Sequence, residues 1–279
     1  MIVLINGGMI SIDTLKAAPG PVAIVEASYP GFYGAQTIAK AVFGQINRWG
    51  KNTVTIFKAE QFGETDDGQH AAQVWKPGTT FDMVHNDPSL LCILQAIPAA
   101  DSASHPCQLD FSMQSPPGRT YRYFKQQPLW KFGAGLSLTS FALQDTTAAG
   151  SKALLSGDDS ASVTLSLNVS NTGGREGDEV VMVFISPPAS LRSAEPARML
   201  QRQLVAFERI HLPKGASTSL AFKIGLKELQ LHDSEGNTVV YGGDYKVSVT
   251  NGNDGERESV EHVLSVKGGY KRLVEAFDK

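Results

Sequence analysis

The sequence predicts an α/β partial sandwich, built from parallel strands with helices, followed by an all-β sandwich. Unbroken apolar runs that end in glycine turns predict the first part, and short segments of alternating polarity predict the second. The 279 residues are 42% hydrophobic and 19% charged, so the chain can bury a core in one large or two ordinary domains.

Two apolar runs near the N-terminus are interpreted as buried strands. The first runs from Ile2 to Ile5 and ends at Asn6-Gly7-Gly8, and the second runs from Val22 to Val25. Continuous apolar runs fit strands that are covered on both faces, as in a parallel sheet. A short crossover helix is expected between them, at about 11–17.

A longer helix is predicted after the turn at Pro30-Gly31, in the segment "GAQTIAKAVFG". Its expected apolar face is made of Ala35, Ile38, Ala39, Val42 and Phe43. The turn before it would lie at the carboxyl edge of a sheet, which is where open α/β folds usually bind ligands.

The pattern changes farther along the chain. Residues 61–117 show little periodicity and contain six prolines. From about residue 160 the chain alternates between polar and apolar residues, as in "SVTLSLNV", and later apolar segments are separated by glycine-rich turns. About seven short strands at this spacing predict a β-sandwich of the immunoglobulin or fibronectin type III kind.

Three separated motifs follow one another along the chain. The first is "VAIVEASYPGFYGAQTIAKAVFG", and the second is "PPGRTYRYFKQQPLWKFGAGLSLTSF". The third consists of "VSNTGGREGDEVVMVFIS", "LVAFERIHLPKG" and "GGDYKVSV". In this order they resemble glycoside hydrolase family 3 β-glucosidases and β-xylosidases, and the third motif resembles the fibronectin type III-like domain of that family. The resemblance covers nearly the whole chain.

The resemblance implies retaining hydrolysis of a β-linked glycoside by a three-domain enzyme. In the family, a barrel holds the aspartate nucleophile, and an α/β sandwich contributes the acid/base glutamate in many members. Aligned by motif order, this chain corresponds to the end of the α/β sandwich (1–60), a long loop and interdomain segment (61–145) and the fibronectin type III-like sandwich (146–279). The nucleophile motif is not in the chain, so no catalytic residue is assigned, and we expect it to be inactive without an upstream barrel partner, in the same gene or on a separate chain.

The resemblance also suggests two groups of functional residues. Glu26, Tyr29 and Tyr33 lie around the turn at the sheet edge and are candidates for substrate binding. Glu26 is interpreted either as an acid that faces the crevice or as a rim residue paired with a basic neighbour. In the second motif, Arg119, Tyr121, Arg122 and Trp130 are candidates for packing between domains, because aromatic rings bury large areas and guanidinium groups stack on them; direct sugar contact is the alternative for these aromatics.

One loop departs from the family pattern. In "GQINRWGKNTVTIF", Arg48 stands where the family has a proline, and Asn52-Thr53 stands where it has Leu-Pro. Proline fixes the backbone angle φ and stiffens a loop. We therefore expect this loop to be less constrained than in typical members.

Several classes of function are not indicated. The net charge of −3 has no long run of one sign, which argues against nucleic acid, and no apolar run is long enough to span a membrane. The six histidines show no metal-ligand spacing, so no metal or cofactor is expected. The state of Cys92 and Cys107, the sugar specificity and the compartment stay open, although the family is often secreted, lysosomal or vacuolar. The sequon Asn168-Val-Ser170 falls inside a predicted strand and receives little weight.

Two alternatives stay open at this point. The chain could be a non-catalytic module that binds carbohydrate or protein through aromatics such as Trp75 and Trp130. It could also be a truncated product that self-associates through the exposed edge of its incomplete sheet.

Overall fold

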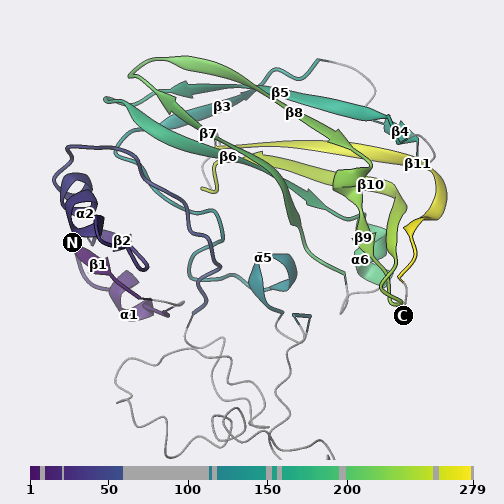
Figure 1. Ribbon diagram of the computed structural model, residues 1–279, viewed down its shortest axis with the longest axis horizontal. Coiled ribbons are helices and arrows are strands. Elements are labelled where there is room, and N and C mark those ends of the chain that lie inside the picture. The colour runs from purple at the N-terminus through teal and green to yellow at the C-terminus, as the bar shows by residue number, and fades with distance from the viewer. Residues whose placement is uncertain are drawn as a thin grey trace, which may run out of the picture.

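The computed structural model describes the chain in nine stretches: 1–6, 10–20, 22–58, 113–114, 118–148, 153–155, 159–194, 199–253 and 258–277. Cys92, Cys107 and Trp75 lie outside them. A small N-terminal piece stands beside a larger, strand-rich part, and a linking segment with one short helix runs between them (Figure 1). The predicted fold class, an α/β portion followed by a β-sandwich, is confirmed.

The N-terminal piece contains two strands and two helices. Its elements are β1 (Ile2–Leu4), α1 (Asp13–Lys16), β2 (Ile24–Glu26) and α2 (Gly34–Val42). The two strands pair in parallel, with Ile2 opposite Ile24, as their apolar sequences predicted. A small cluster built on Ile12, Ile56 and Leu129 packs against this sheet.

The N-terminal piece leaves much of its apolar surface open. We expected both strands to be covered on both faces, yet Val3 and Ile5 are exposed. The predicted apolar face of α2 is also only partly covered: Ile38 and Val42 are half-buried, whereas Ala35, Ala39 and Phe43 are exposed, Phe43 by 80%. A two-stranded sheet is too narrow to cover these faces, so the pattern in the sequence implies a larger sheet than the described residues form.

The strand-rich part is a sandwich of two sheets. The smaller sheet has the antiparallel order β3-β5-β8, with β3 at Phe141–Asp145, β5 at Ser162–Asn171 and β8 at Ser217–Gly225. The larger sheet has the order β4-β11-β10-β6-β7, and β9 pairs with β10 beside it. Its strands are β4 (Ala153–Leu155), β6 (Gly177–Ser186), β7 (Gln203–Leu212), β9 (Leu231–His232), β10 (Thr238–Thr250) and β11 (Ser259–Glu275).

Alternating side chains of the two sheets form the main core. On β5, Leu165, Leu167 and Val169 point inward and are buried. Tyr245 on β10 is also buried there, and its hydroxyl donates a hydrogen bond of 2.9 Å to the carbonyl of Tyr241. This bond satisfies the one polar atom of the ring, as in the tyrosine corner of immunoglobulin-like sandwiches, and burial raises the pKa of Tyr245.

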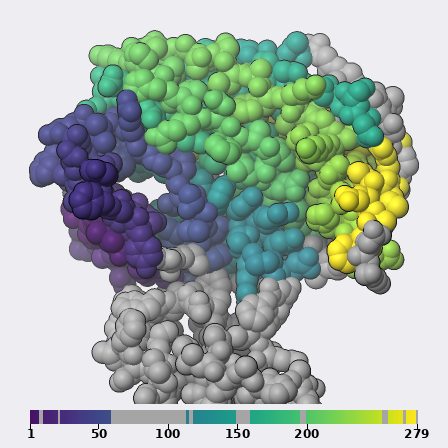
Figure 2. Space-filling model, viewed as in Figure 1, coloured from purple at the N-terminus to yellow at the C-terminus, as the bar shows by residue number. Residues whose placement is uncertain are grey.

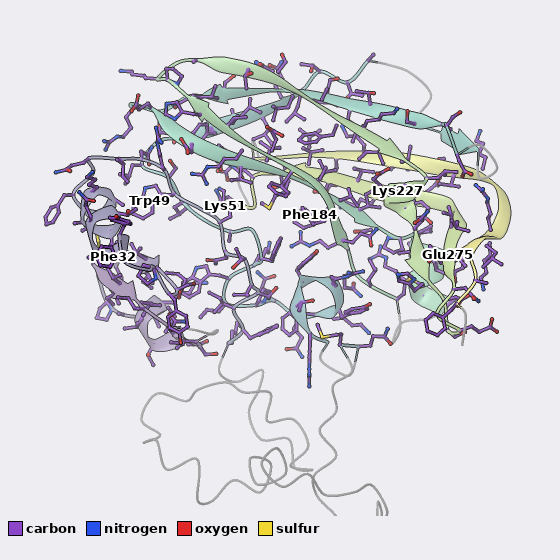
Figure 3. The ribbon with its side chains drawn as sticks, in the orientation of Figure 1. Phe32, Trp49, Lys51, Phe184, Lys227 and Glu275 are labelled. Atoms are coloured by element: carbon purple, nitrogen blue, oxygen red, sulfur yellow. The ribbon has the colours of Figure 1, made fainter. Side chains whose placement is uncertain are left out.

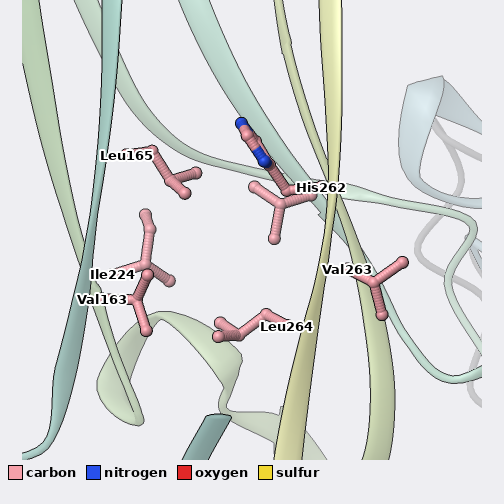
Figure 4. A pocket seen from close by; sticks show the side chains of 7 residues that line it. Val163, Leu165, Ile224, His262, Val263 and Leu264 are labelled. Carbon is pink, nitrogen blue, oxygen red and sulfur yellow. The ribbon is translucent and has the colours of Figure 1, made fainter. Parts of the chain in front are cut away.

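A narrow gap between the sheets is not a ligand site. Aliphatic side chains and His262 line it, and it leaves no space for a water molecule (Figure 4). His262 is buried on β11, and its Nε2 lies 3.6 Å from Asp145 Oδ1 on β3.

The described residues also contain three short helices: α5 (Thr120–Tyr123), α6 (Ala189–Ala194) and the 3₁₀ helix η2 (Lys227–Leu229). Across the described residues, no helix has the length and hydropathy of a membrane span.

The open surface of the N-terminal piece predicts self-association. In light scattering, the whole chain should form dimers or larger species, because the apolar faces and strand edges of β1 and β2 invite pairing. A fragment from residue 118 onward, which keeps the linking segment on the outer face of the larger sheet, should be monomeric at the same concentration. A monodisperse monomer of the whole chain would contradict this prediction.

Candidate functional site

The turn after β2 is ordered by Glu26. This residue ends the strand opposite Leu4, and its Oε1 accepts hydrogen bonds from the backbone N–H of Ser28 (2.8 Å) and from the Ser28 hydroxyl (3.3 Å). Ser28 has a positive φ of 47°, which is unfavourable for a residue with a Cβ. The carboxylate of Glu26 thus stabilises a tight turn. Its hydrogen-bond partner is Ser28 of the same turn, whereas the sequence suggested a basic residue.

Three aromatic side chains project from this turn into solvent. Tyr29, Phe32 and Tyr33 are 78%, 94% and 73% exposed, and the rings of Phe32 and Tyr33 meet edge to face with centroids 5.1 Å apart. Figure 3 shows Phe32 on the outer side of the N-terminal piece. A Cβ on Gly34 would lie 2.3 Å from the Cβ of Pro30, so only glycine lets α2 begin this close to the turn. The arrangement presents aromatic faces beside a carboxylate, which suits a ligand with apolar faces and hydroxyl groups.

The segment after α2, residues 44–58, runs along the sandwich and is held there by Asn47. The buried Asn47 Oδ1 accepts a hydrogen bond from the Leu138 N–H (3.0 Å), and its Nδ2 donates to the carbonyl of Glu176 (2.9 Å). Its own carbonyl accepts a bond from the Asp178 N–H at 3.1 Å. One side chain therefore links this segment to the start of β3 and to the turn before β6.

A buried ion pair fixes the same segment farther on. Lys51 Nζ lies 2.7 Å from Glu179 Oε1 on β6, and the two side chains are only 10% and 3% exposed. The other Glu179 oxygen accepts a bond from Asn251 Nδ2 (3.1 Å), and Lys51 also donates to the carbonyl of Gly135 (2.9 Å). The charges are paired and also hydrogen-bonded, which is the condition under which a buried ion pair is tolerated.

Backbone hydrogen bonds also hold the loop around Arg48. Besides Asn47 and Lys51, the Asn52 N–H donates to the carbonyl of Ala134 (2.8 Å), and Asn52 accepts a bond of 2.8 Å from the Gly133 N–H. Ile56 pairs with Trp130 in an antiparallel bridge. Backbone pairing with residues 130–134 holds this loop without the missing prolines.

The linking segment, residues 118–135, packs on the outer face of the larger sheet. The ring of Tyr121 stacks on Phe132 with centroids 4.3 Å apart, and both meet Phe184 of β6 edge-on. The guanidinium of Arg202 lies 4.4 Å from the Phe184 ring centroid. Phe184 is 1% exposed although it points away from the sandwich core, so this face of β6 is covered by the linking segment (Figure 3).

The same segment also packs on the N-terminal piece. Lys16 Nζ donates to the carbonyl of Leu129 (2.8 Å) and lies 5.0 Å from the centroid of the Trp130 ring. Phe124 meets Phe57 edge to face, with centroids 4.6 Å apart. Residues 118–135 therefore contact both parts of the molecule, and in Figure 2 the N-terminal piece lies at the side of the sandwich.

The two predicted arginines contact the structure through the backbone. Arg119 precedes α5, and its N–H donates to the carbonyl of Met113 (2.8 Å). The carbonyl of Arg122 accepts a bond from the Gln201 N–H, while Arg122 Nε is buried with no hydrogen-bond partner among the described residues. Arg202, which was not among the predicted residues, stacks on Phe184.

The predicted residues thus form two separate groups. Glu26, Tyr29 and Tyr33 share one turn, whereas Tyr121 and Trp130 lie on opposite sides of the linking segment. The sequence analysis did not identify Asn47, Lys51 or Phe184 as residues that join other segments to the sandwich. For Phe184 a signal exists: the strand "VVMVFIS" does not alternate, which is typical of a strand covered on both faces.

The carboxylates of Asp233 and Glu235 are hydrogen-bonded within one turn. Asn237 Nδ2 donates to both Asp233 Oδ2 and Glu235 Oε2, each at 3.0 Å. Asp233 Oδ2 also lies 2.8 Å from Lys271 Nζ, and hydrogen bonding by this lysine lowers the pKa of Asp233. Both carboxylates are therefore held in place by hydrogen bonds inside the turn, and Asp233 also by its ion pair with Lys271. The described residues also contain no group of three potential metal ligands.

Comparison with known proteins supports the resemblance seen in the motifs. A family model of the fibronectin type III-like domain matches residues 179–252, which span β6 to the end of β10. The chain is 27% identical over 274 residues to beta-D-xylosidase 1 of Arabidopsis thaliana, covering 89% of this chain and 30% of that protein. It is 25% identical over 264 residues to an exo-1,4-beta-xylosidase of Emericella nidulans, covering 90% of this chain and 28% of the relative.

Solved structures show the same fold. A GH3 exo-beta-xylosidase matches with a TM-score of 0.68 at 20% identity, covering 100% of this chain and 32% of that one. The beta-D-glucoside glucohydrolase of Trichoderma reesei matches with a TM-score of 0.60 at 22% identity, covering 95% and 33%. The chain thus corresponds to the C-terminal part of family 3 glycoside hydrolases of the β-xylosidase and β-glucosidase type, and it spans about a third of their length or less.

The Lys51–Glu179 pair gives a stability prediction. Lys51→Met should lower the free energy of unfolding by about 3 kcal/mol, because it leaves the buried Glu179 carboxylate unpaired. Adding Glu179→Met should recover part of that loss. The measurement is urea unfolding followed by tryptophan fluorescence.

The control for this pair is Lys246→Met. Lys246 forms a 2.6 Å ion pair with Glu261, but both side chains are more than half exposed, so the change should cost less than about 1 kcal/mol. Equal losses for the two lysine variants would contradict the role assigned to Lys51.

Asp178, beside Asn47, gives a prediction for pH. Burial raises the pKa of Asp178, but hydrogen bonds with His211 and Arg209, each 2.7 Å away, outweigh burial and lower it. A lowered pKa in the folded state stabilises the protein above the unfolded value of about 3.9, and the benefit disappears as the pH falls through the folded value. Asp178→Asn should therefore cost about 1 kcal/mol at pH 7, and the variant and the parent should converge in stability as the pH falls through the folded pKa of Asp178. A difference in unfolding free energy between variant and parent that stays constant in urea titrations at several pH values would refute this assignment.

Proposed function

We propose that this chain forms the C-terminal part of a retaining β-xylosidase or β-glucosidase, and that it hydrolyses β-linked glycosides only together with the catalytic barrel of that enzyme. The observation that carries the proposal is the coverage of the match. The similarity extends over about nine tenths of this chain but over less than a third of the xylosidase relatives. The remaining length of those relatives is sufficient for a catalytic domain.

The carboxylates of the described residues support an active site whose catalytic acids come from another part of the enzyme. A retaining glycosidase needs two carboxyl groups about 5–5.5 Å apart, one as nucleophile and one as acid/base. Asp233 and Glu235 are held in a turn, Glu179 is paired with Lys51, and Glu26 caps the turn at Ser28. Each of these carboxylates has a structural partner, which favours a catalytic pair contributed from elsewhere.

Within that enzyme, we assign the turn after β2 to the side that faces the substrate. Tyr29 and Tyr33 project from it, and exposed aromatic rings suit stacking on the apolar face of a sugar. Glu26 would hold the turn in shape through Ser28 and thereby position the aromatic rings. The position of the turn, at the carboxyl end of a parallel strand, is typical of ligand sites in α/β folds.

We further propose a junction role for the predicted residues of the linking segment. Tyr121 packs on the sandwich through Phe184, and Trp130 packs beside Ile56 of the N-terminal piece. Under this proposal the chain divides into the end of the α/β domain at 1–60, the linking region at 61–145 and the fibronectin-like domain at 146–279. The alternative of a separate binding module gains no support from Trp130, because Lys16 covers its ring and the ring packs on the small N-terminal cluster.

The proposal is tested by reconstitution with an aryl β-xyloside and an aryl β-glucoside. The chain alone should show no turnover. Turnover should appear when the N-terminal portion of the Arabidopsis relative is mixed with it or joined to it. In the active assembly, Tyr29→Ala and Tyr33→Ala should raise KM a few-fold with little change in kcat.

Phe277→Ala is the matched control, because Phe277 is also an exposed aromatic residue, 60% exposed, but lies near the C-terminus beside Gly236. It should leave KM unchanged. Turnover by the chain alone, or an assembly that forms but stays inactive, would contradict the proposed function.

A further inference from the structure

We propose that Asn168 is an acceptor for an N-linked glycan. Asn168-Val169-Ser170 matches the acceptor pattern Asn-X-Ser/Thr, and it is the only such tripeptide in the 279 residues. Its position inside a strand argued against it at the level of sequence. The structure removes that objection, because the side chains of a strand point to alternate faces.

The side chains of Asn168 and Ser170 both face away from the sandwich core. On β5, Leu167 and Val169 are buried between the sheets, while Asn168 and Ser170 lie on the outer face and are partly exposed. Asn168 Nδ2 lies 3.4 Å from Ser170 Oγ. The amide that would carry the sugar and the hydroxyl that completes the acceptor pattern are therefore adjacent on the same outer surface.

The surroundings of Asn168 leave room for a bulky, polar group. Its partners on the neighbouring strands are Gln144 of β3 and Ser219 of β8, which are both exposed and uncharged. Ser217 adds a hydroxyl that donates to Ser170 Oγ at 2.8 Å. A flat surface of small hydroxyl and amide side chains can be covered by a hydrated glycan without burying a charge.

Among the described residues, the aromatic contacts that hold the linking segment on the sandwich lie away from the outer face of the smaller sheet. The linking segment and residues 44–58 pack on the other sheet, around Phe184 and Glu179. In Figure 1 the sheet β3-β5-β8 lies on the side away from α5. A glycan at Asn168 would cover this free face and leave the junction with the N-terminal piece untouched.

The modification is redox-neutral. The Asn168 amide nitrogen attacks the anomeric carbon of a lipid-pyrophosphate-linked oligosaccharide in the secretory pathway. A nitrogen–carbon bond forms and the carbon–oxygen bond to the pyrophosphate breaks. The amide loses one proton to the base of the transferase, and the lipid pyrophosphate leaves with the bonding electron pair. The proposal does not depend on glycosidase activity.

The test is to produce the full chain with a secretion signal in a glycosylating eukaryotic host and to analyse the combined luminal and secreted material. The expected result is a mass that falls on treatment with an amidase that releases N-glycans. Peptide mass spectrometry should then find aspartate at position 168, because release converts the amide to an acid. Asn168→Gln and Ser170→Ala should abolish the effect, and Ser170→Thr should retain it.

Ser166→Ala is the matched control, since Ser166 lies on the same face of the same strand outside the tripeptide, and this variant should stay glycosylated. Unmodified Asn168 in folded, luminal or secreted chain would overturn the proposal. Loss of the glycan in the Ser166 variant would overturn it as well, because the acceptor pattern would then not explain the modification. Thermal unfolding of the Asn168→Gln chain, expected to match the enzymatically deglycosylated parent, shows whether that variant still folds.

Discussion

The arrangement of the molecule depends on the outer face of one strand, β6. Its inward side chains complete the sandwich core, and its outward side chains Met182 and Phe184 are buried as well. Gly133 lies so close that a Cβ there would be 2.7 Å from Met182 Cε. Met182 Cε is the flexible end of its side chain and can shift, so it is the positive φ of Gly133, 83°, that favours glycine at this position. This packed second face joins the linking segment, and through it the N-terminal piece, to the sandwich.

The buried Lys51–Glu179 pair restricts the positions in which the segment after α2 can pack on the sandwich. An apolar face accepts a partner in several registers, but a buried carboxylate is satisfied only where a cation meets it. Glu179 also binds Asn251, so the pair connects β6, the end of β10 and the segment after α2. Burial makes the pair costly to break, which favours a single position of the N-terminal piece and hence of the aromatic turn that it carries.

The two outer faces of the sandwich have different chemistry. The face of the larger sheet around β6 is aromatic and is covered by the linking segment. The face of the smaller sheet carries serine, asparagine and glutamine and is open to solvent. This difference lets the sandwich pack on one face while the other face stays hydrated.

The sequence by itself determined the fold class, the parallel pairing of β1 and β2 and the family resemblance, because apolar periodicity and ordered motifs are local properties of the chain. It also located the turn at Pro30-Gly31. Only the tertiary structure decided that Glu26 caps its own turn, that Asn47 and Lys51 hold their loop on the sandwich, and that Arg202 stacks on Phe184. These contacts join residues far apart in sequence, and a polar side chain shows no periodicity that reveals its partner. Asn168 makes the same point, because its sequon could be read from the chain, but its outward direction followed from the register of β5 against the core.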